Sequence, residues 1–394
     1  MNNYTEAVPF KIDIEEEKLN DVQERLKKSR LSEDFGNQDW KYGTERNYLS
    51  EILKYWIHNY NWRHQEEKIN SFPHYKCEID GNPIHFIHVK GSGKNAKPII
   101  LSHGWPWTFW DYQKIIDPLA NPEKYGGDSE DSFDVIVPSL PGYGFSTPLK
   151  KTGINFWETS DLWVSLMKDV LGYEKFFAHG GDWGSLVTLQ LGHKYSEIVP
   201  ALHTHTTINL DFFERPVPTE DDFSESEKKL HHRNVEFWTE GHGYFQIQAT
   251  KPQTLSYGLN DSPIGLCAWL IEKRRSWGDC GNDIESRFSK DDLINTTMIY
   301  WLSESFVTSA RYYYEAMHNI WKASHDRTPI VESAVGFTVF EGDIIFRPKK
   351  LMAEANNLQY WNVTEKGGHF APMEEPEFLV KEIRKFFSSY RSLV

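Results

Sequence analysis

The chain has 394 residues, of which 39% are hydrophobic and 15% aromatic, and this is enough to form a buried core. Acidic residues outnumber basic residues by 57 to 43, which gives a formal net charge of −14. A surface of this charge repels nucleic acids and anionic membranes, so we expect neither as a partner.

The first residues and the cysteines indicate the compartment. MNNYTEAVPFKIDIEEE is polar and acidic, and it lacks the basic and apolar regions of a secretion signal. The apolar run IGLCAWLI at 264–271 is far shorter than the roughly 18 residues that a membrane-spanning helix needs. Cys77, Cys267 and Cys280 are scattered without metal-ligand spacing, as is typical of a reducing compartment. We therefore expect a soluble, cytoplasmic protein with no integral membrane segment.

Residues 1–90 are predicted to form an N-terminal arm that begins with two helices. Apolar residues recur on one face of 12–31, where Asp13 and Glu16 resemble a capping box at the start of a helix. A wider apolar stripe follows at 47–60 and predicts a second helix.

Short strands are predicted to follow the two helices. YKCEIDGNPIHFIHVKG at 75–91 is typical of a β-hairpin that turns at Asp80-Gly81-Asn82. Beyond it, continuously apolar runs alternate with longer segments in 91–209 and again in 326–394, which predicts crossover helices and a parallel sheet buried on both faces. These runs are PIILSH (98–103), FDVIVPS (133–139), KFFAHG (175–180), VPALHTH (199–205), VGFTVFEG (335–342) and LQYWNV (358–363).

The segment 210–325 interrupts this alternation. It contains no strand-like run of comparable strength, and its pieces are charged and favour helices. We therefore predict a mainly helical cap, inserted between two parts of the sheet and lying over the edge that carries the catalytic residues.

FFAHGGDWGSLVTLQL at 176–191 is the most informative motif. An apolar strand ends in a glycine-rich turn, and a helix follows, as in the nucleophile elbow of hydrolases. Gly180, Gly181 and Gly184 surround Asp182 in the spacing Gly-x-Asp-x-Gly, so the side chain presented at the turn is a carboxylate. The alternative is that Asp182 only caps the following helix.

A carboxylate nucleophile suits displacement at an sp³ carbon, which leaves an alkyl–enzyme ester. Hydrolysis of that ester requires a base that activates water, and His369 in GGHFAPMEEPE follows the last predicted strand. The acid that orients this base is expected after the preceding strand. Asp343 is preferred, and Glu341 remains the alternative.

The ester also requires an oxyanion hole of backbone N–H groups that face the nucleophile. Trp183, the residue after the nucleophile, is expected to supply one of them. Trp105 in the loop HGWPWTF is expected to supply the other, because Pro106 forces its backbone away from helical geometry.

Together these residues resemble the epoxide hydrolases of the α/β-hydrolase fold, and especially the microsomal and juvenile-hormone type. The resemblance covers nearly the whole chain and includes the N-terminal arm, HGWP, PSLPGYGFS, GGDWGS and GGHFAPMEEPE. It implies an α/β fold with a mostly parallel, doubly wound sheet, a helical cap and an N-terminal arm. It also implies a nucleophile at Asp182, a base at His369, an acid at Asp343 and an oxyanion hole at Trp105 and Trp183.

The resemblance further implies two cap tyrosines that hydrogen-bond the epoxide oxygen. EGHGYFQIQATKP places the first at Tyr244, and SARYYYEAM places the second at Tyr313, with Tyr312 and Tyr314 as alternatives. The implied reaction opens a hydrophobic epoxide to a vicinal diol through a hydroxyalkyl-aspartate ester, which water activated by histidine then hydrolyses. The expected partners are a small hydrophobic epoxide and water, with a homodimer left open. Neither a cofactor nor a metal is expected.

Two other functions remain as alternatives. A haloalkane dehalogenase uses the same aspartate nucleophile, and Trp183 could bind its halide, but the HGxP loop carries Trp105 where many dehalogenases have asparagine. A non-catalytic ligand-binding protein on the hydrolase fold is the second alternative.

Within the epoxide hydrolase interpretation, Trp107 and Thr108 depart from the Gly-Ser of many relatives, and Trp107 is expected to narrow or reshape the entrance to the site.

Overall fold

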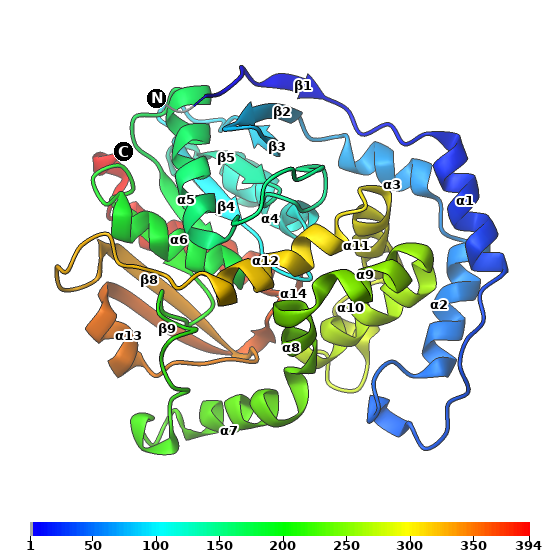
Figure 1. Cartoon of the computed structure of the whole chain (residues 1–394). Helices are drawn as coiled ribbons and strands as arrows, with labels where there is room; N and C mark the ends of the chain where they lie inside the picture. The colour runs from blue at the N-terminus through cyan, green and yellow to red at the C-terminus, as the bar shows by residue number, and fades with distance from the viewer. Residues whose placement is uncertain (1–2) are drawn as a thin grey trace.

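The computed structural model describes residues 3–394, and one sheet of nine strands runs through it (Figure 1). The strands lie in the order β1-β2-β3-β5-β4-β6-β7-β8-β9. Their bounds are β1 (Val8–Phe10), β2 (His74–Ile79), β3 (Asn82–Val89), β4 (Lys97–Ser102), β5 (Phe133–Pro138), β6 (Phe177–Gly180), β7 (Ala201–Thr204), β8 (Val331–Gly342) and β9 (Asn356–Gly368).

The six strands β4 to β9 are parallel, while β1, β2 and β3 join the sheet in antiparallel pairs. Strand β4 lies between β5 and β6, so the chain first moves to one side of β4 and then returns to the other. The carboxyl edge of an open parallel sheet at such a switch point is where ligands bind. The segments that follow β4 and β6 are therefore placed to form a site.

Helices cover both faces of the parallel strands, as expected for a doubly wound sheet (Figure 1). One pair of helices, α5 and α6, packs together on one face, and α4 and α15 pack together elsewhere on the sheet. Strands β4 to β7 are almost entirely buried, which explains their continuously apolar sequences. The helices associated with the sheet are α4 (Gln113–Ala120), α5 (Phe156–Ser165), α6 (Trp183–Lys194), α13 (Lys349–Ala355), α14 (Ala371–Glu374) and α15 (Pro376–Ser388).

The N-terminal arm contains three helices, α1 (Glu16–Lys27), α2 (Arg46–His58) and α3 (Trp62–Ile69). The second agrees with the prediction, but the first is shorter than the predicted 12–31, and the predicted capping box does not cap it. The reason is that α3 holds the preceding residues extended: the Ile12 N–H donates to the Asn70 side chain and the Ile14 N–H to Glu66.

The strand predictions are confirmed with small shifts at their ends, and two features were missed. Strand β1 has only three residues at the sheet edge, too few for a periodic pattern. Strand β8 begins earlier than predicted, and β9 extends further at both ends, because the added residues pair between the two strands, and this pairing cannot be inferred from either segment alone.

Helices account for the regular structure between β7 and β8. They are α7 (Lys228–Glu236), α8 (Gly243–Thr250), α9 (Pro252–Asp261), α10 (Pro263–Trp277), α11 (Lys290–Leu302) and α12 (Phe306–His318), together with short 3₁₀ and π segments. No strand occurs in 210–325, all of which the structure describes. Helices α1 and α2 of the arm pack against α10, so the arm lies beside this helical region (Figure 1). No helix within residues 3–394 is long and apolar enough to cross a membrane.

A buried ion pair joins the helical region to the sheet. Arg274 on α10 lies with its Nη1 atom 2.5 Å from Oδ1 of Asp111, and both side chains are about 3% exposed. The other carboxylate oxygen of Asp111 accepts the backbone N–H of Thr108, in the loop that follows β4. The guanidinium of Arg274 also lies 4.1 Å from the centre of the Phe370 ring, next to His369.

We predict that Asp111→Asn lowers the free energy of unfolding by about 3–5 kcal/mol, because it leaves the charge of Arg274 buried without its counter-charge. Urea unfolding followed by tryptophan fluorescence measures the change. As a control, Asp161→Asn breaks the exposed pair with Lys194 and should cost less than about 1 kcal/mol. Equal, small losses in the two variants would contradict the role given to the buried pair.

Candidate active site

Asp182 lies at a sharp turn between β6 and α6. Its backbone has φ 54° and ψ −127°, a conformation that non-glycine residues rarely adopt and that is concentrated at functional sites. The side chain makes no capping hydrogen bond to α6, which argues against the alternative that Asp182 serves as a helix cap. One carboxylate oxygen, Oδ1, instead accepts the backbone N–H of Trp105 at 2.8 Å.

Two glycines make this geometry sterically possible. A Cβ atom on Gly104 would lie 2.1 Å from Oδ1 of Asp182, and one on Gly184 would lie 1.8 Å from the carbonyl oxygen of Ser102. Any larger residue would push the loop after β4 away from the elbow. The glycines of HGWP and GGDWGS are thus explained by the close approach of two segments.

His369 follows β9 and lies between two carboxylates. Its Nδ1 atom is 2.7 Å from Oδ1 of Asp343, and its Nε2 atom is 3.3 Å from Oδ2 of Asp182. Glu341, the alternative acid, forms an ion pair with Lys229 at 2.6 Å instead. Asp343, rather than Glu341, is thus the carboxylate in contact with the histidine.

Electrostatics at His369 favour the charged imidazole. Burial by itself lowers the pKa of His369, but the charge of Asp343 and the contacts with Asp182 outweigh it, and the pKa lies well above its ordinary value. Opposite charges within a few ångströms are the usual cause of such a rise. With Asp182 ionised, His369 is therefore protonated near neutral pH.

Two tyrosines from different helices face the nucleophile. Tyr244 on α8 and Tyr313 on α12 both line a cavity of about 60 Å³ that also contains Asp182 and His369. Their rings meet edge to face with centroids 5.8 Å apart, and Tyr244 stacks on Trp105 at 5.0 Å. Burial, aided by the charge of Asp182, raises the pKa of both hydroxyls well above its ordinary value, so both remain protonated donors.

The neighbours of Tyr313 have other contacts. The Tyr312 hydroxyl is hydrogen-bonded to Oγ1 of Thr159 at 2.8 Å, and the Tyr314 ring stacks on His318 at 3.9 Å. Neither lines the cavity at Asp182. Of the three consecutive tyrosines, Tyr313 is therefore the one placed near the nucleophile.

The predicted oxyanion residues differ in what they contact. The Trp105 N–H already points at Asp182, whereas no hydrogen bond within residues 3–394 joins the Trp183 N–H to that carboxylate. Trp183 is the first residue of α6, where a backbone N–H has no acceptor within the helix. This N–H is thus available to the carboxyl group of the residue before it.

The expectation for Trp107 is wrong. Its ring is fully buried and does not line the cavity at Asp182. It packs edge to face on His369 with centroids 5.6 Å apart, and it stacks on His205. Trp107 therefore supports the imidazole from behind and does not shape the entrance.

Two contributions to the site were not predicted. Thr206, just after β7, accepts the backbone N–H of Asp182 through Oγ1 at 3.0 Å, and so holds the strained turn. Trp277 at the end of α10 accepts the backbone N–H of His369 through its own backbone carbonyl oxygen, and its ring also lies against the imidazole. The polar HTHTT after an apolar strand could have indicated Thr206, but no local signal marks Trp277.

The fold and the site define a hydrolase of the α/β-hydrolase class. Residues 97–376 match the family model described as alpha/beta hydrolase fold, and residues 7–112 match the model described as epoxide hydrolase N terminus. The chain belongs to the epoxide hydrolases, as the sequence resemblance predicted, and it is an enzyme of that family. Membership favours epoxide hydrolysis over haloalkane dehalogenation and over binding without catalysis.

Several known proteins show the extent of the similarity. Epoxide hydrolase 1 of Oryctolagus cuniculus is 37% identical, over 96% of this chain and 88% of the relative. Juvenile hormone epoxide hydrolase 2 of Ctenocephalides felis is 33% identical, over 99% and 86%. Among solved structures, the Aspergillus niger epoxide hydrolase aligns with a TM-score of 0.84 at 29% identity, over 98% of this chain and 97% of that one.

We predict that Asp182→Asn lowers the pKa of His369 by about one to three, because the substitution removes one of the two negative charges that contact the imidazole. NMR titration of ¹³C-labelled histidine, with the signal assigned through His369→Gln, measures it. The control variant Glu341→Gln removes a nearby carboxylate that pairs with Lys229, and it should leave this pKa in place. An unchanged pKa in Asp182→Asn would show that Asp182 exerts no electrostatic control over His369.

Proposed function

We propose that this epoxide hydrolase opens a hydrophobic epoxide to a vicinal diol through a covalent ester on Asp182. The observation that carries the proposal is the position of one carboxylate between a backbone donor and a histidine: Asp182 accepts the Trp105 N–H through Oδ1, while its Oδ2 faces His369. The hydrogen bond from Trp105 restrains Oδ1, and Oδ2 remains available to attack the epoxide.

In the first step, Oδ2 of Asp182 attacks one ring carbon and the carbon–oxygen bond of the epoxide breaks. The departing oxygen develops negative charge, and the hydroxyls of Tyr244 and Tyr313 donate hydrogen bonds to it. Because burial raises the pKa of both tyrosines, they favour strong hydrogen bonding over complete loss of a proton. The two donors share the negative charge, so each stabilises part of it.

Esterification then converts His369 from an acid into a base. The ester of Asp182 is neutral, so one of the two charges that raise the pKa of His369 disappears when the bond forms. The imidazolium gives its proton to the new alkoxide, and the neutral ring can accept a proton from water. Asp343 keeps the ring oriented through Nδ1.

In the second step, His369 takes a proton from water, and the resulting hydroxide attacks the carbonyl carbon of the Asp182 ester. Negative charge collects on the oxygen held by the Trp105 N–H, with the Trp183 N–H as the second proposed donor. The bond from the carboxyl carbon to the diol oxygen then breaks, and that oxygen takes the proton of the added hydroxyl, so that the diol leaves and the carboxylate is restored beside a protonated His369.

The substrate is proposed to be a hydrophobic epoxide because the cavity lining is largely aromatic and aliphatic. Residues 210–325 are proposed to act as a cap that supplies Tyr244 and Tyr313, while 91–209 and 326–394 form the core that holds Asp182. The lining residues besides the nucleophile, histidine and tyrosines are Trp183, Leu186, Thr206, Ile208, Phe212, Phe213, Phe237, Trp238, Phe245, Ile344 and Ile345.

A single turnover of styrene oxide with excess enzyme in ¹⁸O-labelled water tests the ester. We expect unlabelled diol and one ¹⁸O atom in the peptide that contains Asp182, because water attacks the carboxyl carbon of the enzyme and not the epoxide. Mass spectrometry of the diol and of the peptide measures both. Labelled diol with an unlabelled peptide would contradict the covalent mechanism.

Substitution of the tyrosines tests the proton donors. Tyr244→Phe and Tyr313→Phe should each slow ester formation by about ten- to a hundredfold, the expected effect of removing one hydrogen bond to a charged oxygen. Stopped-flow tryptophan fluorescence follows this step. Tyr312→Phe is the matched control, because its hydroxyl contacts Thr159 outside the cavity, and it should react at nearly the wild-type rate. Wild-type rates in both single variants would remove the tyrosines from the mechanism.

A further inference from the structure

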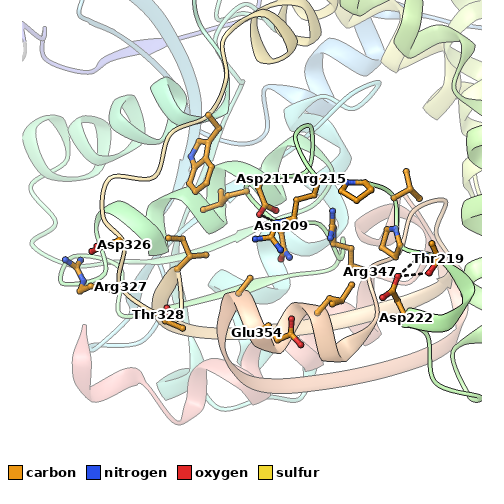
Figure 2. Close-up of a pocket in the computed structure, with 18 residues that line it drawn as sticks. Asn209, Asp211, Arg215, Thr219, Asp222, Asp326, Arg327, Thr328, Arg347 and Glu354 are labelled. Carbon is orange, nitrogen blue, oxygen red and sulfur yellow. Dashed lines mark hydrogen bonds and ion pairs between the residues drawn. The ribbon is translucent and has the colours of Figure 1, made fainter.

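Three neighbouring cavities share lining residues, and the first of them contains Asp182. The catalytic cavity of about 60 Å³ shares the residues Phe212, Phe213, Trp238, Phe245 and Ile345 with a middle cavity of about 210 Å³. The middle cavity in turn shares Arg215, Val217, Pro218 and Arg347 with an outer cavity of about 600 Å³ (Figure 2). The wall nearest the nucleophile is therefore apolar, and two arginines lie farther out.

Arg347 is an unusual residue at this junction. Its backbone N–H is bonded to Thr207 and the residue is only 6% exposed. Its buried Nε atom has no hydrogen-bond partner, and no ion pair of its guanidinium occurs among residues 3–394. Figure 2 shows its side chain directed into the space lined by the labelled residues, with no dashed line reaching it.

Two nearby carboxylates attract Arg347 but form no ion pair with it among residues 3–394. Asp211 forms an ion pair with Arg215, and Asp222 accepts hydrogen bonds from Thr219. The charged residues that line the middle cavity are Arg215 and Arg347, and no carboxylate lines it. The carboxylates that attract Arg347, Asp211 and Asp222, line the outer cavity instead, so no carboxylate faces its guanidinium from the middle cavity.

A buried charge is costly unless it is paired and hydrogen-bonded. The planar fork of a guanidinium matches a carboxylate, which can accept two hydrogen bonds from it at once. We infer that the middle cavity is a subsite in which Arg347 binds a carboxylate carried by the substrate, while the epoxide of the same molecule lies at Asp182. The apolar residues shared by the two cavities would contact the chain between these two groups.

This inference rests on the proposed function, and it names a substrate class: epoxides whose apolar chain ends in a carboxylate. The net charge of −14 would repel such a substrate in general, so a local cation is what would make its binding favourable. Arg347 also discriminates between substrates, because an apolar chain end would leave its buried Nε atom without a hydrogen-bond partner.

The test compares a homologous series of ω-epoxy alkanoates with their methyl esters. At the chain length that spans the two cavities, wild-type enzyme should prefer the carboxylate by about ten- to a hundredfold in kcat/KM, mainly through KM, as expected for hydrogen bonds to a charged group. Arg347→Gln should abolish this preference, and Arg347→Lys, which keeps the charge but loses the fork, should retain part of it.

A matched control is Arg384→Gln. Arg384 is another partly buried arginine with an unpartnered Nε atom, but it donates to the carbonyl oxygen of Pro118 and lines none of the three cavities. This variant should keep the preference of the wild-type enzyme. Loss of the preference in Arg384→Gln as well would mean that a general change in charge is responsible, and it would overturn the inference.

Binding of ligands that carry no epoxide tests the subsite independently of the reaction. Calorimetry on the full chain should show octanoate binding at least about tenfold tighter than octanamide, and Arg347→Gln should remove this difference. If octanoate binding depends on Arg347 but the enzyme hydrolyses no epoxide, the proposed function is contradicted and the subsite is supported. Hydrolysis of both epoxides at equal efficiency, or acetate binding as tightly as octanoate, would overturn the subsite alone.

Discussion

The charge of one buried imidazole, held between two carboxylates, is the interaction on which the rest of the site depends. His369 is almost fully buried and contacts Asp343 on one side and Asp182 on the other. In such surroundings each of the two negative charges favours the positive form of the ring. A reaction that neutralises Asp182 therefore also changes the proton affinity of His369, and in the proposed mechanism this coupling makes the same residue suitable for both half-reactions.

Holding these three groups together requires a strained backbone and close packing. Asp182 adopts a positive φ, and it is kept there by hydrogen bonds from outside its own turn, through Thr206 and Trp105. The parallel sheet makes this possible, because segments that follow parallel strands meet at one edge. Trp105 follows β4, Asp182 follows β6 and His369 follows β9, so residues far apart in the chain converge.

The helical region completes the site from the opposite side. Tyr244 and Tyr313 come from two helices that pack on each other, and their rings contact Trp105 and Trp183 of the core. The buried pair of Arg274 and Asp111 anchors this region to the loop after β4. In the proposed mechanism the two tyrosines act as hydrogen-bond donors, and aromatic contacts that fix their direction suit them to stabilise a short-lived negative charge on the substrate.

The order of apolar runs along the chain was sufficient to predict the fold class and its parallel sheet, because these signals are local. Glycine spacing and motif order marked Asp182 and His369 as the candidate nucleophile and base, whereas Tyr244 was implied by the resemblance to epoxide hydrolases. Tertiary structure decided between Asp343 and Glu341, and between Tyr313 and its neighbours. Adjacent or nearly adjacent residues have almost the same sequence context, yet their side chains point in different directions.

Contacts between distant segments could not be predicted from the sequence. Trp107 was expected near the entrance but lies behind His369, and Trp277 reaches the same imidazole from the end of α10. The unpaired guanidinium of Arg347 is likewise visible only after folding, because its lack of a partner depends on where Asp211 and Asp222 make their own bonds. Composition and motifs specify which groups are available, and only packing decides which of them meet.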